Sequence, residues 1–215
     1  TFPSELTIGL SRKQSLRYGE NPHQQSAFYQ EVLGGIDSIA GAEQLHGKEL
    51  SHNNLLDADA AWSCANDFAD PTFAVIKHAT PCGLASHDEL REAYLRSYAG
   101  DPVSAFGGIV ACNRTLTIEV AEEIAKIFYE VIIAPDFEPA AFERLRRKRD
   151  LRILKAPSPS SRSMGLDYRR VSGGMLVQTR DDLHEDPDSW QTVTSKTPTA
   201  HELADLAFAW RAAKH

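Results

Sequence analysis

The 215-residue sequence has few cysteines, no long apolar run and no excess of basic charge. Cys64, Cys82 and Cys112 are odd in number and widely spaced, which fits neither a disulfide framework nor a zinc knuckle and favours a reducing cytoplasm. There is no run of about 18 apolar residues and no basic-then-apolar leader, so neither a membrane span nor export is indicated. The formal net charge of −7 argues against general nucleic-acid binding.

Common motifs of nucleotide and metal sites are also missing. Without a Gly-x-Gly-x-x-Gly or Walker-type loop, dinucleotide and nucleoside triphosphate binding lose their usual support. After Pro81-Cys82, Ala85 stands where a zinc deaminase has its second cysteine, and the only His-x-Glu sequence, at His87, comes after this pair instead of before it. No metal is therefore expected. A Cys82 nucleophile with His78 as its base can be drawn, but a buried structural thiol is favoured.

What is present is an alternation of strand-like and helical patterns from about residue 56 to 155. This order predicts an α/β fold with a mixed, largely parallel sheet. The residues 81–83 (PCG) are expected to form a turn. We expect helices at 56–68, 88–98, 118–128 and 139–148, and strands at 73–76, 109–111, 131–134 and 151–154.

The stretch 156–167 is rich in Pro and Ser at its start and is expected to be a linker. It separates a first domain, 1–155, from a connecting segment, 168–215. In that segment an extended run at 168–179 precedes a helix that begins after Thr199, with Glu202 completing a capping box. Because the chain opens without Met, a processed piece or a segment of a longer polypeptide is expected.

The motif LRYGENPHQ (16–24) places a cation, an aromatic hydroxyl, an amide and an imidazole in one short loop. These are Arg17, Tyr18, Asn21 and His23. Such a mixture suits an anionic polar ligand. Gly, Asn and Pro this close together are equally typical of a plain surface turn.

The motif KHATPCG (77–83) follows the predicted buried strand 73–76. In open α/β sheets ligands gather at the carboxyl ends of strands, so a Lys-His pair there is placed for chemistry. His78 can shuttle protons, and Lys77 can stabilise developing negative charge. A lysine that reaches solvent beside a satisfied histidine is an equally good interpretation of the pair alone.

Three further motifs are weak individually. DPVSAFGG (101–108) has a glycine pair that lets the backbone approach a ligand closely, as ordinary turns also do. GKELSHNN (47–54) and EVIIAPD (130–136) place polar residues beside apolar elements and are most often caps and turns.

In their order along the chain, these five motifs resemble the AICAR transformylase domain of the bifunctional purine-biosynthesis enzyme. GGMLVQTRDD and VTSKTPTAHELADLAFAWRAAKH extend the resemblance over essentially the whole chain. The resemblance implies formyl transfer from 10-formyltetrahydrofolate, a reduced folate cosubstrate, to the 5-amino group of AICAR, without a metal. It also implies a cytidine-deaminase-like subdomain with the start of a second one, and a homodimer with shared sites.

Carried onto this sequence, the resemblance makes His78 the proton-transferring residue and Lys77 the residue that stabilises charge on the formyl oxygen or the leaving folate. The remaining positions would hold the nucleotide. Arg17 would face its phosphate beside Tyr18, supported by Asn21 and His23, and Gly107 and Glu130 would contact it through backbone and carboxylate.

The resemblance is incomplete in two respects. Nothing corresponds to the IMP cyclohydrolase domain, and the chain ends at Lys214-His215, before the family's Ser-Asn motif and the second subdomain with most folate contacts. We therefore expect an incomplete site that is inactive alone or is completed by another chain, such as a C-terminal half. Thr80, where the family more often has Asn or Ser, is a mild change. The alternative is a noncatalytic nucleotide-binding or assembly module of the same fold.

Overall fold

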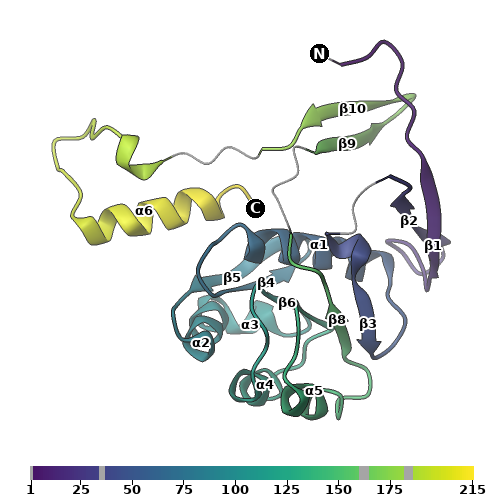
Figure 1. The fold of residues 1–215 in the computed structure, drawn as a ribbon, viewed down its shortest axis with the longest axis horizontal. Helices are drawn as coiled ribbons and strands as arrows, with labels where there is room; N and C mark the ends of the chain where they lie inside the picture. Colours follow the sequence, from purple (N-terminus) through teal and green to yellow (C-terminus); the bar gives the residue numbers. More distant parts are fainter. Residues whose placement is uncertain (1, 34–36, 160–164, 182–185) are drawn as a thin grey trace. The chain divides into compact units, whose positions relative to one another are not determined.

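The computed structural model describes residues 2–33, 37–159, 165–181 and 186–215. The chain divides into two compact units, Thr1–Ser158 and Pro159–His215 (Figure 1). This boundary lies within the stretch 156–167 that the sequence suggests as a linker. Residues 160–164 of that stretch lie outside the described part of the chain.

A six-stranded mixed sheet forms the centre of the first unit. Its strand order is β3 (Glu43–His46), β8 (Arg152–Lys155), β7 (Val131–Ala134), β6 (Ile109–Cys112), β4 (Thr72–Lys77) and β5 (Thr80–Ser86). The pairs β6–β7 and β7–β8 are parallel, whereas the pairs β3–β8, β4–β6 and β4–β5 are antiparallel. The α/β class is therefore confirmed, with parallel pairing confined to the middle of the sheet.

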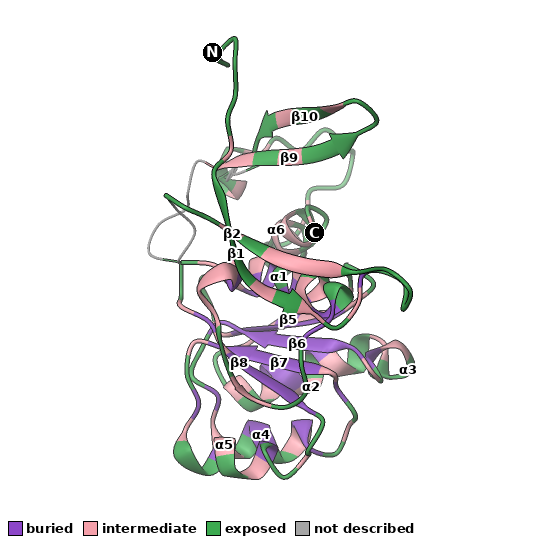
Figure 2. Cartoon of the chain, turned by 90° about the vertical axis from the view of Figure 1, so that its right-hand side faces the viewer, coloured by how far each residue is buried: buried purple, intermediate pink, exposed green. Residues whose placement is uncertain are grey.

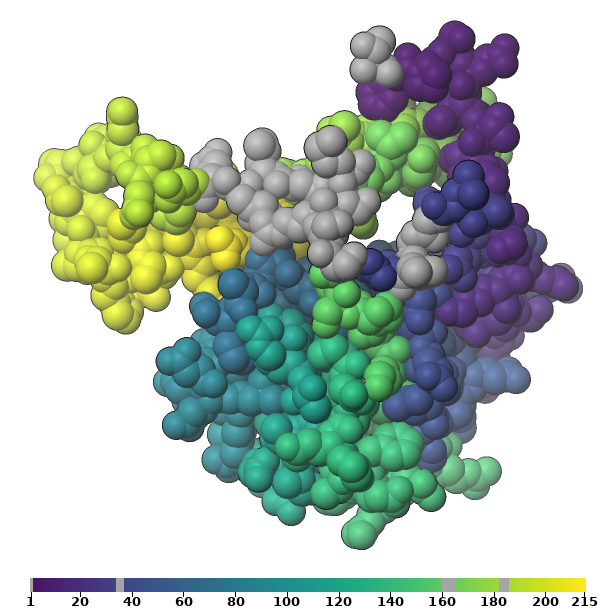
Figure 3. All heavy atoms as spheres, in the orientation of Figure 1, coloured from purple at the N-terminus to yellow at the C-terminus, as the bar shows by residue number. Residues whose placement is uncertain are grey.

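Helices cover both faces of this sheet, because its middle strands are apolar at every position and side chains alternate between the two faces. Helix α1 (His52–Asn66) packs on one face through small side chains such as Ala58 and Ala61. The other face is covered by α2 (Leu90–Gly100), α4 (Ile118–Ile124) and α5 (Pro139–Leu145). Figure 2 shows β6 and β7 buried between these layers, and Figure 3 shows the teal to green atoms of α4 and α5 closely packed.

The first helix begins earlier than its apolar pattern suggests, at His52 instead of residue 56. The reason is a capping box. The Ser51 hydroxyl accepts from the Asn54 amide at 3.2 Å, and the Asn54 side chain accepts from the Ser51 amide at 3.1 Å. Two other helices end earlier than predicted. Helix α4 ends at Ile124 instead of residue 128, and α5 ends at Leu145 instead of residue 148.

The prediction of a turn at residues 81–83 is wrong, because these residues belong to strand β5 (Thr80–Ser86). Lys77 of β4 pairs directly with Thr80 of β5, so the turn is made by His78 and Ala79. Pro81 is tolerated in β5 because this strand lies at the edge of the sheet, where one row of amides has no partner strand.

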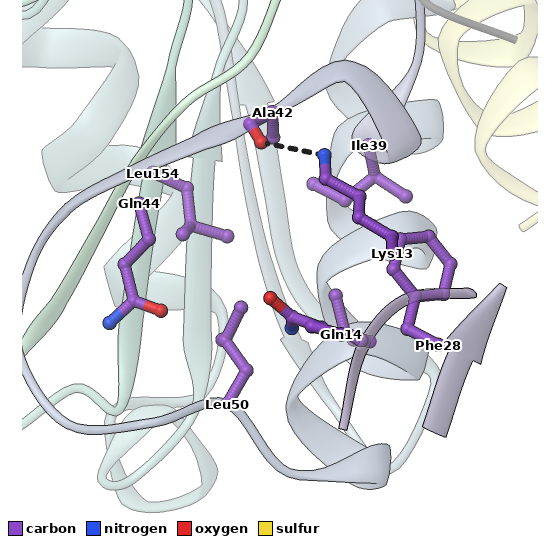
Figure 4. A pocket seen from close by; sticks show the side chains of 9 residues that line it. Lys13, Gln14, Phe28, Ile39, Ala42, Gln44, Leu50 and Leu154 are labelled. Atoms are coloured by element: carbon purple, nitrogen blue, oxygen red, sulfur yellow. Dashed lines mark hydrogen bonds between the residues drawn. The ribbon is translucent and has the colours of Figure 1, made fainter. Parts of the chain in front are cut away.

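A hairpin of β1 (Leu10–Leu16) and β2 (Ser26–Glu31) completes the first unit, and its connection carries most of the LRYGENPHQ motif. Lys13 anchors the hairpin to the 3₁₀ helix η1 (Ile39–Gly41) and the residue after it. Its ammonium group donates to the carbonyl oxygens of Ala40 and Ala42, the latter at 3.2 Å (Figure 4). Beside Lys13 is a small pocket of about 30 Å³, lined also by Phe28 and Leu50.

The second unit contains a hairpin and a helix. Strands β9 (Leu166–Val171) and β10 (Gly174–Thr179) pair antiparallel around Gly173, whose φ is +79°. After the 3₁₀ helix η2 (Pro187–Ser189), α6 spans Ala200–Ala212 and begins with the expected capping box of Thr199 and Glu202. Among the described helices, none combines the length and the apolar character that crossing a membrane requires.

Candidate active site

Four of the candidate residues, Lys77, His78, Gly107 and Glu130, lie at one end of the strands of the central sheet. The register pairs Ile76 at the end of β4 with Ile109 at the start of β6, and Ile109 with Val131 at the start of β7. Lys77 and His78 therefore lie beside the residues that precede β6, including Gly107, while Glu130, which precedes β7, lies one strand further along the same end of the sheet. As expected from the sequence, the Lys-His pair lies at the carboxyl end of a buried strand, β4. Because β4 runs antiparallel to β6, the neighbouring residues precede the amino ends of β6 and β7.

His78 occupies the exposed tip of the β4–β5 hairpin. Both residues of its turn are left-handed, with φ of +54° at His78 and +59° at Ala79. A two-residue hairpin with positive φ at both positions normally contains Asn and Gly, because a β-carbon costs about 1 kcal/mol or more in this conformation. Such strain persists where neighbouring structure holds it, and it concentrates at functional sites.

The neighbouring structure here includes Asp57 of helix α1. Its Oδ1 atom accepts a hydrogen bond from the Ala79 amide at 2.7 Å. The sequence analysis did not select Asp57, which precedes a run of small helical residues and has no local sign of a tertiary partner. The GKELSHNN motif and the residues after it thus contact the KHATPCG motif across the fold.

Lys77 connects the same turn to the DPVSAFGG motif. Its Nζ atom donates to the carbonyl oxygen of Phe106 at 2.9 Å. Helix α3 (Pro102–Ala105), just before Phe106, is capped by Asp101, which accepts from the backbone and hydroxyl of Ser104. The hydrogen bonds from Ser104 hold the pKa of the Asp101 carboxyl below its usual value, so this cap is a carboxylate at neutral pH.

Gly107 adopts a conformation that favours glycine, with φ of +74°. Its amide donates to the Phe128 carbonyl at 2.8 Å, and the aromatic rings of Phe106 and Phe128 lie 5.3 Å apart. Because the Gly107 amide is engaged, its carbonyl oxygen is the backbone group left to contact a ligand.

Glu130 is held by two donors on one carboxylate oxygen. Its Oε2 atom accepts from Asn54 Nδ2 and from Arg152 Nη1, each at 3.1 Å. The Arg152 side chain is only 7% exposed, whereas that of Glu130 is 40% exposed, and Arg152 Nε also donates to the Glu49 carbonyl at 3.0 Å. The sequence analysis missed Arg152, although an arginine inside the apolar strand sequence LRIL is itself a sign of a buried partner.

The LRYGENPHQ loop is attached to the start of α1. The His52 amide donates to the Tyr18 carbonyl at 3.3 Å, and Asn53 Nδ2 donates to the Glu20 carbonyl at 3.4 Å. Inside the loop, the Asn21 amide donates to the Gln24 side chain at 2.7 Å.

Within this loop, the side chains of two candidates face solvent. Arg17 and His23 are exposed, and the Arg17 guanidinium lies 5.5 Å from the centre of the Tyr18 ring. The first turns of α1 thus contact the loop, Glu130 and the His78 turn in succession. In the described part of the chain, no hydrogen bond or ion pair joins Arg17, Tyr18, Asn21 or His23 directly to Lys77 or His78.

The cysteine alternative is weakened by geometry. Cys82 is half-buried, and its thiol donates to the Val75 carbonyl at 3.4 Å. Burial raises the pKa of this thiol, which disfavours the thiolate that a nucleophile needs. Over the ranges that the structure describes, no group of three or more His, Cys, Asp or Glu side chains is arranged to hold a metal ion.

The sequence profile described as "AICARFT/IMPCHase bienzyme" matches residues 1–215 of this chain. Curated relatives named bifunctional purine biosynthesis protein PurH are 51% identical in Caldicellulosiruptor saccharolyticus, 47% in a Thermoanaerobacter species and 46% in Listeria welshimeri. Each match covers 100% of this chain and 42% of the relative. The chain thus spans less than half the length of these proteins. From the profile match and these identities together, the chain belongs to the AICARFT/IMPCHase bienzyme family.

Proposed function

We propose that this chain is part of an AICAR transformylase of purine biosynthesis, which transfers the formyl group of 10-formyltetrahydrofolate to AICAR and yields FAICAR. The observation that carries the proposal is the strained turn that presents His78 next to Lys77, whose ammonium group is fixed by the Phe106 carbonyl just before Gly107. Family membership supports the same chemistry. The cytidine-deaminase-like form of the fold, the domain limits 1–155 and 168–215, and a cytoplasmic location belong to this proposal.

In the proposed reaction the AICAR amino nitrogen attacks the formyl carbon, and the bond from that carbon to the folate nitrogen breaks. The attacking amine must lose a proton and the leaving nitrogen must gain one. An imidazole at the exposed tip of the turn suits both steps, because histidine accepts and returns protons near neutral pH. His78 is therefore assigned to proton transfer.

Lys77 is assigned to charge stabilisation. An ammonium group has three donors, and one of them bonds the Phe106 carbonyl, which fixes the position of Nζ. The other two are available for the formyl oxygen or the leaving folate as negative charge develops there. A donor fixed before the reaction stabilises a transition state without reorganising.

The nucleotide is assigned to the residues around the start of α1. Arg17, exposed beside Tyr18, would pair with the phosphate, with Asn21 and His23 supporting the loop. Glu130 would accept a substrate donor through Oε1, since the bonds from Asn54 and Arg152 both go to Oε2. The Gly107 carbonyl would add a backbone contact.

The folate contacts are expected to come from the rest of the protein or from a second subunit of a homodimer. The full-length protein should release tetrahydrofolate only when AICAR is present, and this chain alone should show negligible turnover. Mixing this chain with a separately produced C-terminal half should restore the reaction. A full-length protein that binds AICAR but forms no FAICAR would instead support a noncatalytic nucleotide-binding or assembly module.

A further inference from the structure

The turn that presents His78 is held in a conformation that its sequence disfavours. Lys77 and Thr80 are paired, which leaves two residues, His78 and Ala79, to reverse the chain. Both are left-handed, and neither is the Gly or Asn that populates this region readily. Without an external restraint, such a turn samples other conformations, and the orientation of the His78 side chain varies with them.

The restraint is a carboxylate on a rigid element. Asp57 Oδ1 accepts from the Ala79 amide at 2.7 Å, at the short end of the range for N–H···O hydrogen bonds. Asp57 is half-buried, and its neighbour Ala58 is fully buried against the sheet, so α1 fixes the position of the carboxylate. The bond orients the peptide plane between His78 and Ala79.

We propose that Asp57 is a positioning residue for His78, a role that rests on the proposed formyl transfer. Asp57 touches the turn and not the reacting atoms. By fixing the peptide plane after His78, it sets the direction from which the imidazole approaches the amine. Because misplacement of a reacting group by about 1 Å can cost 100-fold in rate, the turn requires such a restraint.

The His78 turn and the loop proposed to bind the nucleotide contact different residues of α1, so turnover and nucleotide affinity should respond differently to a change at Asp57. The proposed nucleotide contacts of Arg17 and Tyr18 are attached at the start of α1 through His52 and Asn53, not through Asp57. Loss of the Asp57 acceptor should therefore lower kcat and leave KM for AICAR nearly unchanged.

Four variants of the full-length protein isolate this effect. Asp57→Ala removes the acceptor, and Asp57→Asn keeps an acceptor oxygen in the same place. Ala79→Gly in the Asp57→Ala background relieves the left-handed cost at position 79. Glu122→Ala removes the same charge from an exposed position of α4, which covers the opposite face of the sheet from α1, and is the matched control.

Hydrogen exchange of the peptide that contains Ala79, followed by mass spectrometry without substrate, is measured beside steady-state kinetics. Asp57→Ala should speed exchange by about 10-fold or more and lower kcat by roughly 10- to 100-fold, with KM for AICAR within about 3-fold. Asp57→Asn should stay within a few-fold of the unmodified protein, and Ala79→Gly should restore part of the lost kcat.

Unchanged exchange in Asp57→Ala would overturn the inference, as would an equal loss of kcat in Glu122→Ala or no recovery with Ala79→Gly. The exchange measurement needs no substrate, so it separates two failures. If His78→Ala keeps full turnover, the proposed function of the site fails together with this role. If exchange is unchanged while His78→Ala is inactive, only the role of Asp57 fails.

Discussion

Arg152 and Glu130 form an ion pair whose partners differ in exposure. Their Nη1 and Oε2 atoms are 3.1 Å apart, and the Arg152 side chain is 7% exposed against 40% for Glu130. Removing one member of a pair is costly in proportion to how well the other is shielded from water. The pair is therefore expected to respond unequally to substitution of its two members.

Glu130→Met should lower the free energy of unfolding by about 3 kcal/mol, because it leaves the Arg152 cation buried without its carboxylate. Arg152→Met should lower the free energy of unfolding by about 1 kcal/mol, because the partly exposed Glu130 carboxylate can be hydrated. Urea unfolding of this chain measures both. Lys48→Met is the control, since it removes an exposed pair with Asp150 that should contribute less than about 0.5 kcal/mol. Equal losses in the two Met variants would contradict the assigned burial.

Gly83 allows β5 to pass close to α2. A β-carbon at this position would lie 2.0 Å from the Ser97 carbonyl oxygen, a backbone atom that cannot move aside cheaply. Gly83→Ala should destabilise the first unit by about 3 kcal/mol or prevent its folding, as overpacking does in close-packed interiors. Gly9→Ala is the matched control, because its new β-carbon would meet only Val32 at 3.8 Å. Thermal unfolding checks the pair, and a Gly83→Ala protein with an unchanged Tm would refute the close approach.

The first unit should lose stability in alkali. Burial raises the pKa of Cys64 and of Cys112 from the ordinary value of 9.0 to about 12, and burial likewise raises the pKa of Tyr94 to about 12. Because the unfolded chain releases these protons at lower pH than the folded protein, stability is complete below about pH 9 and falls as pH rises toward 12.

Urea unfolding between pH 8 and pH 11 measures this slope, to which each group contributes at most about 1.4 kcal/mol per pH unit. Cys64→Ala and Cys112→Ala should each flatten the slope by removing one titrating group. A stability that stays constant over this range would show that these groups are not shielded from water as the fold requires.

The sequence could predict most elements of the first unit from about residue 56 onward, since those strands and helices have clear apolar patterns. It predicted none of β1, β2 and β3, whose residues are largely exposed or half-buried and lack such a pattern. The pattern at Phe73 to Ile76 predicted β4, and Thr199 with Glu202 predicted the cap of α6. The sequence did not predict β5, because Pro81 and Gly83 are typical of turns. These residues form an edge strand only because they pair with β4, which local sequence does not reveal.

Candidate site residues could be selected from the sequence, but their arrangement could not. Lys77 and His78 stood out by their chemistry, and the family resemblance added Gly107 and Glu130. Asp57 and Arg152 gained their significance only from tertiary contacts, the first with the Ala79 amide and the second with Glu130. The strand direction that places them together is a property of the whole sheet, which local patterns do not encode.

The proposed roles of His78 in proton transfer and of Arg17 in holding the nucleotide are separated by a comparison of two variants of the full-length protein. Steady-state formyl transfer and AICAR binding are measured side by side. His78→Ala should lower kcat on the order of 100-fold or more and leave AICAR affinity within a few-fold, whereas Arg17→Ala should mainly weaken binding. A His78→Ala protein that keeps full turnover would contradict the account.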